Sequence, residues 1–298
     1  MMKSFGNPII PNSAKGNTWD PYVLRHGGCY YHCYSNAQGV YVTRSETLWD
    51  IGKDETIQVY DCTKEGALCE WFAPELHHIN GKWYIYASPD YGGWMHTMTV
   101  LVGEGDTPMC LYRNEGAIGG LEGKWTIDGT VMIHQGQLYF IWSDCSALYL
   151  AQMSDPCRIT GEIITLSRPE YPFETKIGPV IEGPALLYRN GKIHIVYSAN
   201  DSKYDEYCLG LLTFDGGQDI MDASHWIKTD HAVFEKTDKI FGPGHCSFTT
   251  VTENGREVDY IVYHANLVSG SGWSGRNVFI QPFDWNEHDL PVFGKPEF

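Results

Sequence analysis

Short runs of alternating or apolar residues recur along the chain, and each follows a turn that contains glycine. These runs occupy residues 30–34, 83–86, 138–142, 193–197 and 260–263. A second strand-like run ends just before each turn, at residues 20–26, 73–79, 128–134, 182–189 and 247–252. Two such runs joined by a glycine turn predict a β-hairpin. Third strands are expected at residues 40–42, 97–101, 147–151, 209–212 and 278–281, whereas outer strands are recognisable only at 56–60 and 162–166.

The hairpins recur at a nearly constant spacing. The second glycine of each turn lies at position 28, 81, 136, 191 or 255, so successive turns are 53, 55, 55 and 64 residues apart. A repeat of about 55 residues made of strands is typical of a radial array of small sheets. We therefore predict an all-β fold, a five-bladed β-propeller that occupies residues 1–298 as a single domain. The glycine-rich segment 269–275 predicts a mobile loop, either a lid or a plain surface loop.

Acidic residues stand at the start of the first strand in three of the repeats. Asp20 and Asp128 lie eight residues before the turn glycine of their repeats, and Glu182 lies nine before its own. Equivalent positions of a propeller are related by rotation about one axis, so we expect these side chains to converge there. One such acid alone could form a turn or a β-bulge. Three at matched positions favour a shared chemical role.

Converging carboxyl groups are the machinery of glycoside hydrolysis. One carboxylic acid protonates the leaving oxygen, and a second carboxylate activates water or attacks directly. The pKa values of the two groups must be pushed apart, and a third carboxylate can raise the pKa of the acid by repulsion. The alternative from another class is a sugar-binding propeller without catalysis. The chain has no GxSxG elbow, Walker loop or dinucleotide-binding glycine set that would indicate other chemistry.

The charge of the chain excludes some partners. There are 21 Lys and Arg against 37 Asp and Glu, a formal net charge of −16. This charge repels phosphate backbones and anionic lipid surfaces, so we expect neither nucleic acid nor a membrane as partner. No apolar run reaches the roughly 18 residues of a membrane span. The first residues show no apolar signal-peptide core, which predicts a cytoplasmic protein, or a secreted one if a leader has been removed.

The cysteines also bear on the compartment. There are nine, an odd number without a CxxC pair, and this fits neither a disulfide framework nor a zinc ribbon. We therefore expect most of them to be reduced and buried in strands. This favours a reducing compartment.

Several phrases of the chain together resemble glycoside hydrolase family 43. They are Trp19-Asp20-Pro21-Tyr22, Ala73-Pro74-Glu75-Leu76-His77, Ile127-Asp128-Gly129-Thr130, Ile181-Glu182-Gly183-Pro184 and Gly242-Pro243-Gly244-His245. The resemblance runs from about Pro8 to Pro296 and implies a five-bladed propeller with inverting arabinofuranosidase, arabinanase or xylosidase activity. It implies that Asp20 is the general base, that Glu182 is the general acid, and that Asp128 modulates the pKa of Glu182.

Other runs narrow the expected substrate. Residues 204–212, 224–228 and 242–248 resemble members that release terminal L-arabinofuranose from α-1,5-linked arabino-oligosaccharides or arabinan. The chain also ends after the fifth repeat, without the β-sandwich common in the xylosidase branch. An arabino-oligosaccharide is therefore the expected partner. A β-xylosidase or an endo-arabinanase on the same propeller stays open as an alternative, and the sequence predicts no oligomeric state.

The resemblance also implies roles for residues around the acids. Trp19, Trp71, Phe72 and Arg276 are expected to contact the sugar, with Phe72 in a place where the family usually has Trp. A solvated surface position is the alternative for Arg276. His245 is expected to face the axial cavity, beside a possible structural Ca²⁺ coordinated mostly by water, and a histidine that binds only water is the alternative. No other cofactor is expected.

Overall fold

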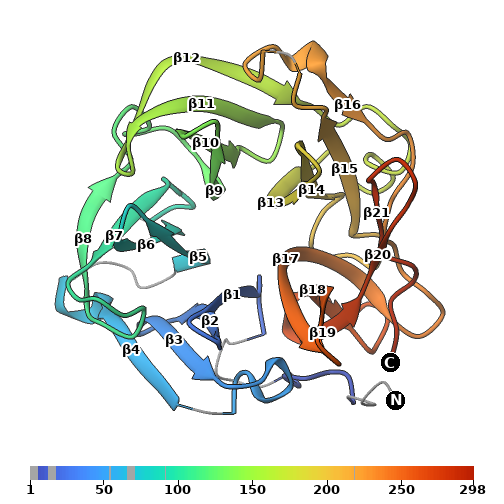
Figure 1. Cartoon of the computed structure of the whole chain (residues 1–298), viewed down its shortest axis with the longest axis horizontal. Coiled ribbons are helices and arrows are strands. Elements are labelled where there is room, and N and C mark those ends of the chain that lie inside the picture. The colour runs from blue at the N-terminus through green and yellow to red at the C-terminus, as the bar shows by residue number, and fades with distance from the viewer. Residues whose placement is uncertain (1–5, 13–17, 54, 66–70, 91, 218) are drawn as a thin grey trace.

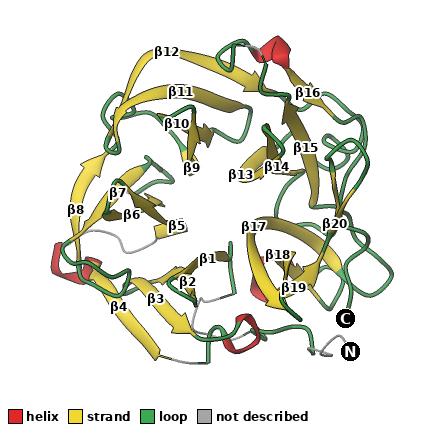
Figure 2. Ribbon diagram, viewed as in Figure 1, coloured by secondary structure: helices red, strands yellow, loops and turns green. Residues whose placement is uncertain are grey.

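Five antiparallel sheets surround a central axis in the computed structural model, which describes residues 6–12, 18–53, 55–65, 71–90, 92–217 and 219–298 (Figure 1). The architecture is a five-bladed β-propeller, as the sequence predicts. Figure 2 shows that strands and loops make up nearly all of the described chain. The first strand of each blade lies nearest the axis and the last lies on the rim, so each blade runs outward in chain order.

The blades are as follows. The first contains β1 (Tyr22–His26), β2 (Cys29–Asn36), β3 (Gly39–Ser45) and β4 (Glu55–Asp61). The second contains β5 (Trp71–Ile79), β6 (Lys82–Pro89), β7 (Thr99–Gly103) and β8 (Tyr112–Ala117). The third contains β9 (Ile127–His134), β10 (Gln137–Ser143), β11 (Leu148–Asp155) and β12 (Arg158–Ser167). The fourth contains β13 (Ile181–Arg189), β14 (Lys192–Ala199), β15 (Cys208–Phe214) and β16 (Trp226–Lys228). The fifth contains β17 (Phe241–Glu253), β18 (Arg256–Asn266) and β19 (Arg276–Pro282).

Short elements join these sheets. The 3-10 helices are η1 (Leu48–Asp50), η2 (Cys62–Glu65), η3 (Ala223–His225) and η4 (Gly272–Gly275). A small hairpin of β20 (Asp284–Trp285) and β21 (Pro291–Val292) follows the fifth blade. None of the helices among the described residues is long and apolar enough to cross a membrane.

The repeated glycine turns fold as the sequence predicts. In every turn both central residues have positive φ, 47–57° at the first and 78–84° at the second. These values match a two-residue type I′ turn, whose twist fits the twist of the flanking strands. Glycine holds the second position each time because it adopts this conformation without steric cost. The predicted hairpins are therefore confirmed.

The apolar residues form five clusters, and each cluster lies between two neighbouring blades. Leu76 and Val42 belong to the cluster between blades one and two, and both are fully buried. Burying apolar surface is the main driving force for folding. Each blade therefore depends on its neighbours for its core.

The ring is closed by the N-terminal segment. The Ile9 and Val278 N–H groups donate to the carbonyls of Val278 and Ile10, each at 2.9 Å, so the segment forms a β-bridge with the outer strand of the fifth blade. The buried Asn7 side chain extends this pairing, because its amide donates to Ile280 O at 2.8 Å and its carbonyl accepts from Ile280 N–H at 3.1 Å. The two ends of the described chain thus share one sheet edge.

A side chain near the end of each second strand bonds to the start of the next blade. We call this contact a latch. The latch hydroxyls are those of Ser35, Ser88, Ser143 and Ser198, which bond to the backbone of Trp71, Asp128, Ile181 and His245. At the last junction His264 replaces serine, and its Nδ1 accepts the Asp20 N–H at 3.3 Å. The latches fix the height of each inner strand relative to its neighbour.

Candidate active site

Equivalent residues of all five inner strands adopt the left-handed backbone conformation, and we call them the hub positions. They are Asp20 (φ 46°), Ala73 (45°), Asp128 (54°), Gly183 (56°) and His245 (40°). On blades two to five, the residue just before each hub position pairs across the strands with a latch residue. This shared register shows that the hub positions are equivalent. Aspartate and histidine tolerate this conformation better than most residues, whereas a side chain such as that of Ala73 is strained by about 1–2 kcal/mol.

The hub brings the predicted acids together. Glu182 immediately precedes the hub glycine of blade four, and Gly183 N–H donates to Asp128 Oδ2 at 3.0 Å. His245 Nδ1 lies 3.4 Å from Asp20 Oδ1 and 3.8 Å from Asp128 Oδ2, so one imidazole connects blades one and three. The acids of three blades therefore share one site on the axis.

The electrostatics of the site favour the protonated forms of Glu182 and Asp128. Burial raises the pKa of Glu182, and the Asp20 carboxylate raises it further, against the Tyr207 hydrogen bond and the positive charges nearby. Burial also raises the pKa of Asp128 to about 7, and the charges of Glu182 and Asp20 add to this against His245. Asp20 is among the charges that act most strongly on the pKa of Glu182, and Asp128 is not. The role of Asp128 in modulating the pKa of Glu182 therefore stays a prediction.

His245 is the cation among these acids. Burial acts to lower its pKa, but the carboxylates of Asp20, Asp128 and Glu182 outweigh burial and raise it. Calcium prefers oxygen ligands, and the described residues offer no group of three or more His, Cys, Asp or Glu side chains arranged to hold a metal. These side chains would not enclose a calcium ion by themselves, so a calcium ion beside His245 coordinated mostly by water stays a prediction, and no step of the chemistry is assigned to a metal.

Arg276 is part of the site rather than a solvated surface residue. It is 6% exposed, and its Nη1 donates to Asp20 Oδ1 at 3.0 Å. Its Nη2 donates to Ser202 O at 3.2 Å, which ties the guanidinium to the β14–β15 loop. A fixed guanidinium beside Asp20 orients that carboxylate and compensates its charge. Its contact with sugar hydroxyls stays a prediction.

The predicted aromatic contacts lie in different environments. Trp19 is 42% exposed beside Asp20, and Phe72 is half-buried beside the hub residue Ala73. Trp71 is 5% exposed, and its ring packs edge-on against Tyr60 at 5.0 Å in the cluster between blades one and two. This burial corrects the interpretation of Trp71, because a ring enclosed by the core has no face free for a sugar.

Sequence reasoning missed the side chains that hold Glu182. The Tyr207 hydroxyl donates to Glu182 Oε1 at 2.8 Å, and the Cys145 thiol contacts Oε2 at 3.6 Å. The Tyr207 ring stacks on the buried His264 ring, with centroids 5.7 Å apart and planes at 8°. His264 in turn lies 3.4 Å from Asp20 Oδ1. A continuous set of contacts thus joins the predicted acid to the predicted base.

The glycine-rich segment is tied down rather than free. Asp205 on the β14–β15 loop accepts from Gly270 N–H at 2.9 Å and from the Ser269 hydroxyl at 2.5 Å. The Trp273 indole N–H donates to Ser202 Oγ at 3.1 Å. These bonds join two loops of neighbouring blades beside Arg276. They argue against the predicted mobility of the segment.

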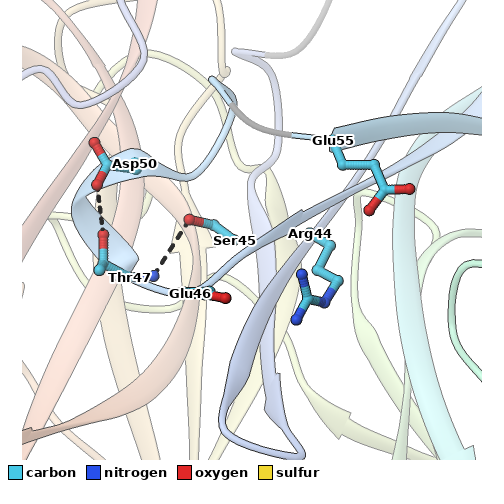
Figure 3. Close-up of a pocket in the computed structure, with 6 residues that line it drawn as sticks. All are labelled: Arg44, Ser45, Glu46, Thr47, Asp50 and Glu55. Atoms are coloured by element: carbon cyan, nitrogen blue, oxygen red, sulfur yellow. Dashed lines mark hydrogen bonds between the residues drawn. The ribbon is translucent and has the colours of Figure 1, made fainter.

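Two cavities lie outside this constellation. One, of about 190 Å³, follows the axis and is lined by Tyr22, Glu75, Thr130 and Ser247 among others, each two residues beyond a hub position. Figure 3 shows the other, a hollow near the rim lined by Arg44, Ser45, Glu46, Thr47, Asp50 and Glu55. The rim hollow contains none of the predicted site residues, so we assign it no part in the chemistry.

The cysteines differ from expectation at one position. Cys62 is disulfide-bonded, whereas seven other cysteines among the described residues are free. A stable disulfide is typical of an oxidising environment. The cysteines therefore no longer support the prediction of a reducing compartment.

Comparisons with known proteins agree with the fold and with the family resemblance. The sequence matches the profile of glycosyl hydrolases family 43 over residues 5–291. An extracellular exo-α-(1→5)-L-arabinofuranosidase of Streptomyces chartreusis is 33% identical over 277 residues, which cover 88% of this chain and 82% of that enzyme. A crystal structure of an α-L-arabinofuranosidase from Lactobacillus brevis is 32% identical, with a TM-score of 0.89 and coverage of 98% and 96%.

A second Streptomyces relative bears on localisation. An extracellular exo-α-(1→5)-L-arabinofuranosidase of Streptomyces avermitilis is 29% identical over 98% of this chain, which spans 64% of that enzyme. The expectation of a cytoplasmic protein is wrong by this comparison, because both Streptomyces relatives are extracellular enzymes. With a family match over nearly the whole chain and a relative above 30% identity, the protein belongs to glycosyl hydrolases family 43.

Proposed function

We propose that this protein is an inverting α-L-arabinofuranosidase that releases terminal L-arabinofuranose from α-1,5-linked arabino-oligosaccharides and arabinan. One observation carries the proposal: Asp20, Asp128 and Glu182 meet on the axis of a family 43 propeller. The arabinofuranosidase names of its relatives support the choice of sugar.

In the proposed reaction, Asp20 accepts a proton and Glu182 donates one. Asp20 takes a proton from a water molecule as the water oxygen bonds to the anomeric carbon. The bond between that carbon and the leaving oxygen breaks, and Glu182 gives its proton to the leaving oxygen. Arg276 and His245 hold the Asp20 carboxylate in place. The products are β-L-arabinofuranose and an oligosaccharide shortened by one unit.

Inversion makes a geometric demand on the site. A water molecule must fit between the base and the anomeric carbon, so the reacting carboxyl groups of such enzymes stand about 6.5–9.5 Å apart. Asp20 and Glu182 belong to blades one and four, which are not neighbours in the ring. We therefore expect the Asp20 and Glu182 carboxyl groups to stand this far apart.

The proposal is tested by following product formation from linear α-1,5-arabino-oligosaccharides by proton NMR. We expect arabinose alone as the released monosaccharide, with the β-anomer formed first. Asp20→Ala and Glu182→Ala should each lower kcat by about 10²–10⁴-fold, the usual contribution of one acid or base. Release of xylose alone, formation of the α-anomer first, or substrate binding without turnover would each reject the assignment.

A further inference from the structure

Four aromatic rings run outward from the hub over blades two and three, and we call them the aromatic track. Phe72, beside the hub residue Ala73, meets the His96 ring edge-on at 4.9 Å. His96 then contacts the rings of Trp125 at 5.7 Å and Trp94 at 6.2 Å. The track therefore begins at the active site and ends in solvent.

The outer end of the track is held in a strained conformation. Trp94 has φ 64°, and 65% of its surface is exposed. The Trp125 indole N–H donates to the Trp94 carbonyl at 2.6 Å, which fixes the backbone at this point. A left-handed tryptophan costs about 1–2 kcal/mol, and an exposed indole gains little packing in return. Strain of this kind collects at ligand sites.

The aromatic track lies on the side of the site opposite the two loops that Asp205 joins. His96 pairs with Asp90, so the β6–β7 connection returns to the end of the blade where β5 begins. Trp125 lies three residues before the hub residue Asp128, at the start of blade three. The interlocked loops held by Asp205 lie on blades four and five instead.

We propose that the aromatic track binds the sugar unit that follows the scissile bond in an arabino-oligosaccharide. This inference rests on the proposed function. When the terminal unit lies among the acids, the rest of the chain must leave the hub across one side of the ring. The C–H face of a furanose is apolar and weakly positive, so it is attracted to the negative face of an indole. An uncharged sugar also suits this acidic protein.

The first test compares substrates with and without a second sugar. Methyl α-L-arabinofuranoside has no ring to stack on the track, whereas arabinotriose does. Trp94→Asn should lower kcat/KM for arabinotriose about tenfold, the factor that about 1.4 kcal/mol of binding corresponds to, and leave kcat/KM for the methyl glycoside unchanged. Because asparagine tolerates the left-handed conformation, the melting temperature should hold or rise. Trp94→Phe should restore part of the loss.

The control is Ile227→Ala, which removes an apolar side chain that is 68% exposed on the rim strand β16. It should change neither substrate's kinetics. An equal effect of Trp94→Asn on both substrates, or no effect on either, would show that the aromatic track does not bind the second sugar unit.

A binding measurement separates this inference from the proposed function. Arabinotriose is titrated calorimetrically into Glu182→Gln and into Glu182→Gln with Trp94→Asn. About tenfold weaker binding by the second protein supports the track, whether or not the wild type hydrolyses the sugar. Equal affinities reject it. Absence of arabinose release by the wild type rejects the proposed function alone.

Discussion

At the residue scale, Gly244 shows how closely the acid is held. It pairs with His264 across β17 and β18, and a Cβ built on it would lie 2.1 Å from Tyr207 Cε1. Such a contact is far inside the ordinary separation of carbon atoms. Any side chain here would push the Tyr207 ring away, and with it the hydroxyl that donates to Glu182. The glycine is thus part of the support of the acid.

Removing the Tyr207 hydroxyl should change the pH dependence of the reaction. That hydrogen bond favours the ionised form and lowers the pKa of Glu182. Tyr207→Phe should therefore raise this pKa and move the alkaline limb of the kcat profile to higher pH. A hydrogen bond to a charged group contributes about 1.5–3 kcal/mol, so a shift of about one to two pH units is expected. The pH dependence of arabinose release measures it.

Tyr204→Phe provides the control, because Tyr204 is 47% exposed on the same loop, and the side chains that bond to Glu182 in the described part of the chain are those of Tyr207 and Cys145. Its profile should match that of the wild type. A Tyr207→Phe profile with an unmoved alkaline limb, or one moved to lower pH, would contradict the role assigned to Tyr207.

The acids could be predicted from the sequence, whereas their supports could not. Asp20 and Asp128 occupy the same hub position, whereas Glu182 lies one residue before the hub glycine of its blade. The predicted match is therefore one residue off for Glu182, but rotation about the axis still places the three acids together. Tyr207 and Cys145 lie in loops that have no counterpart in the repeat pattern. The family resemblance implies a sugar contact for both Trp71 and Phe72, but adjacent residues of a strand face opposite sides, and the Trp71 ring faces the core.

At the element scale, the loops carry the specific contacts and the strands carry the frame. The β14–β15 and β18–β19 loops belong to different blades, yet Asp205 and Ser202 join them. The same Ser202 accepts from Arg276, which donates to Asp20. Order in these loops therefore extends to the predicted base.

Breaking the junction should loosen both loops. Asp205→Ala removes the acceptor for Gly270 N–H and the Ser269 hydroxyl. We expect faster cleavage by protease within residues 267–275, and a several-fold lower kcat/KM because Arg276 loses part of its anchorage. Mass spectrometry of limited digests locates the cut. Asp215→Ala, which removes a local bond to Gly217 N–H, should leave both properties unchanged, and equal digestion of the two variants would count against the junction.

Inner strands were easier to predict than rim strands for a physical reason. Inner and second strands are covered on both faces and flank the type I′ turns, so they show both apolar runs and turn glycines. The rim strands β8 and β16 lack such a pattern, and in β8 only Tyr112 is buried while the other residues are half-buried or exposed. The helical turn that precedes β16 is also short, because it covers only Ala223–His225 and β16 begins directly after it at Trp226.

At the scale of the whole molecule, the ring depends on the junction between blades one and five, which we call the seam. The N-terminal segment pairs with β19, the outer strand of blade five, and the last latch uses His264 where the others use serine. Ser247 adds to this seam, because its hydroxyl accepts from Val23 N–H at 3.0 Å and donates to Pro21 O at 2.8 Å. Blades one and five are therefore joined mainly by contacts between residues far apart in sequence.

Weakening the seam should lower stability without altering the acids. Asn7→Ala leaves the Ile280 N–H and carbonyl without their side-chain partners. A buried hydrogen-bonding group left unpaired costs about 1–3 kcal/mol. The free energy of unfolding in urea should fall by that amount, while kcat of the folded enzyme stays at the wild-type value. Unchanged stability would show that the segment contributes little to closure.

The seam also decides when the enzyme becomes able to work. Asp20 is made early during synthesis, yet Arg276, His264 and His245, which surround its carboxylate, come from the last blade. A nascent or proteolysed chain that lacks this blade would contain all three acids and still have an unsupported base. Turnover therefore requires a complete ring, and a ribosome-bound fragment should show no activity until its final blade has docked.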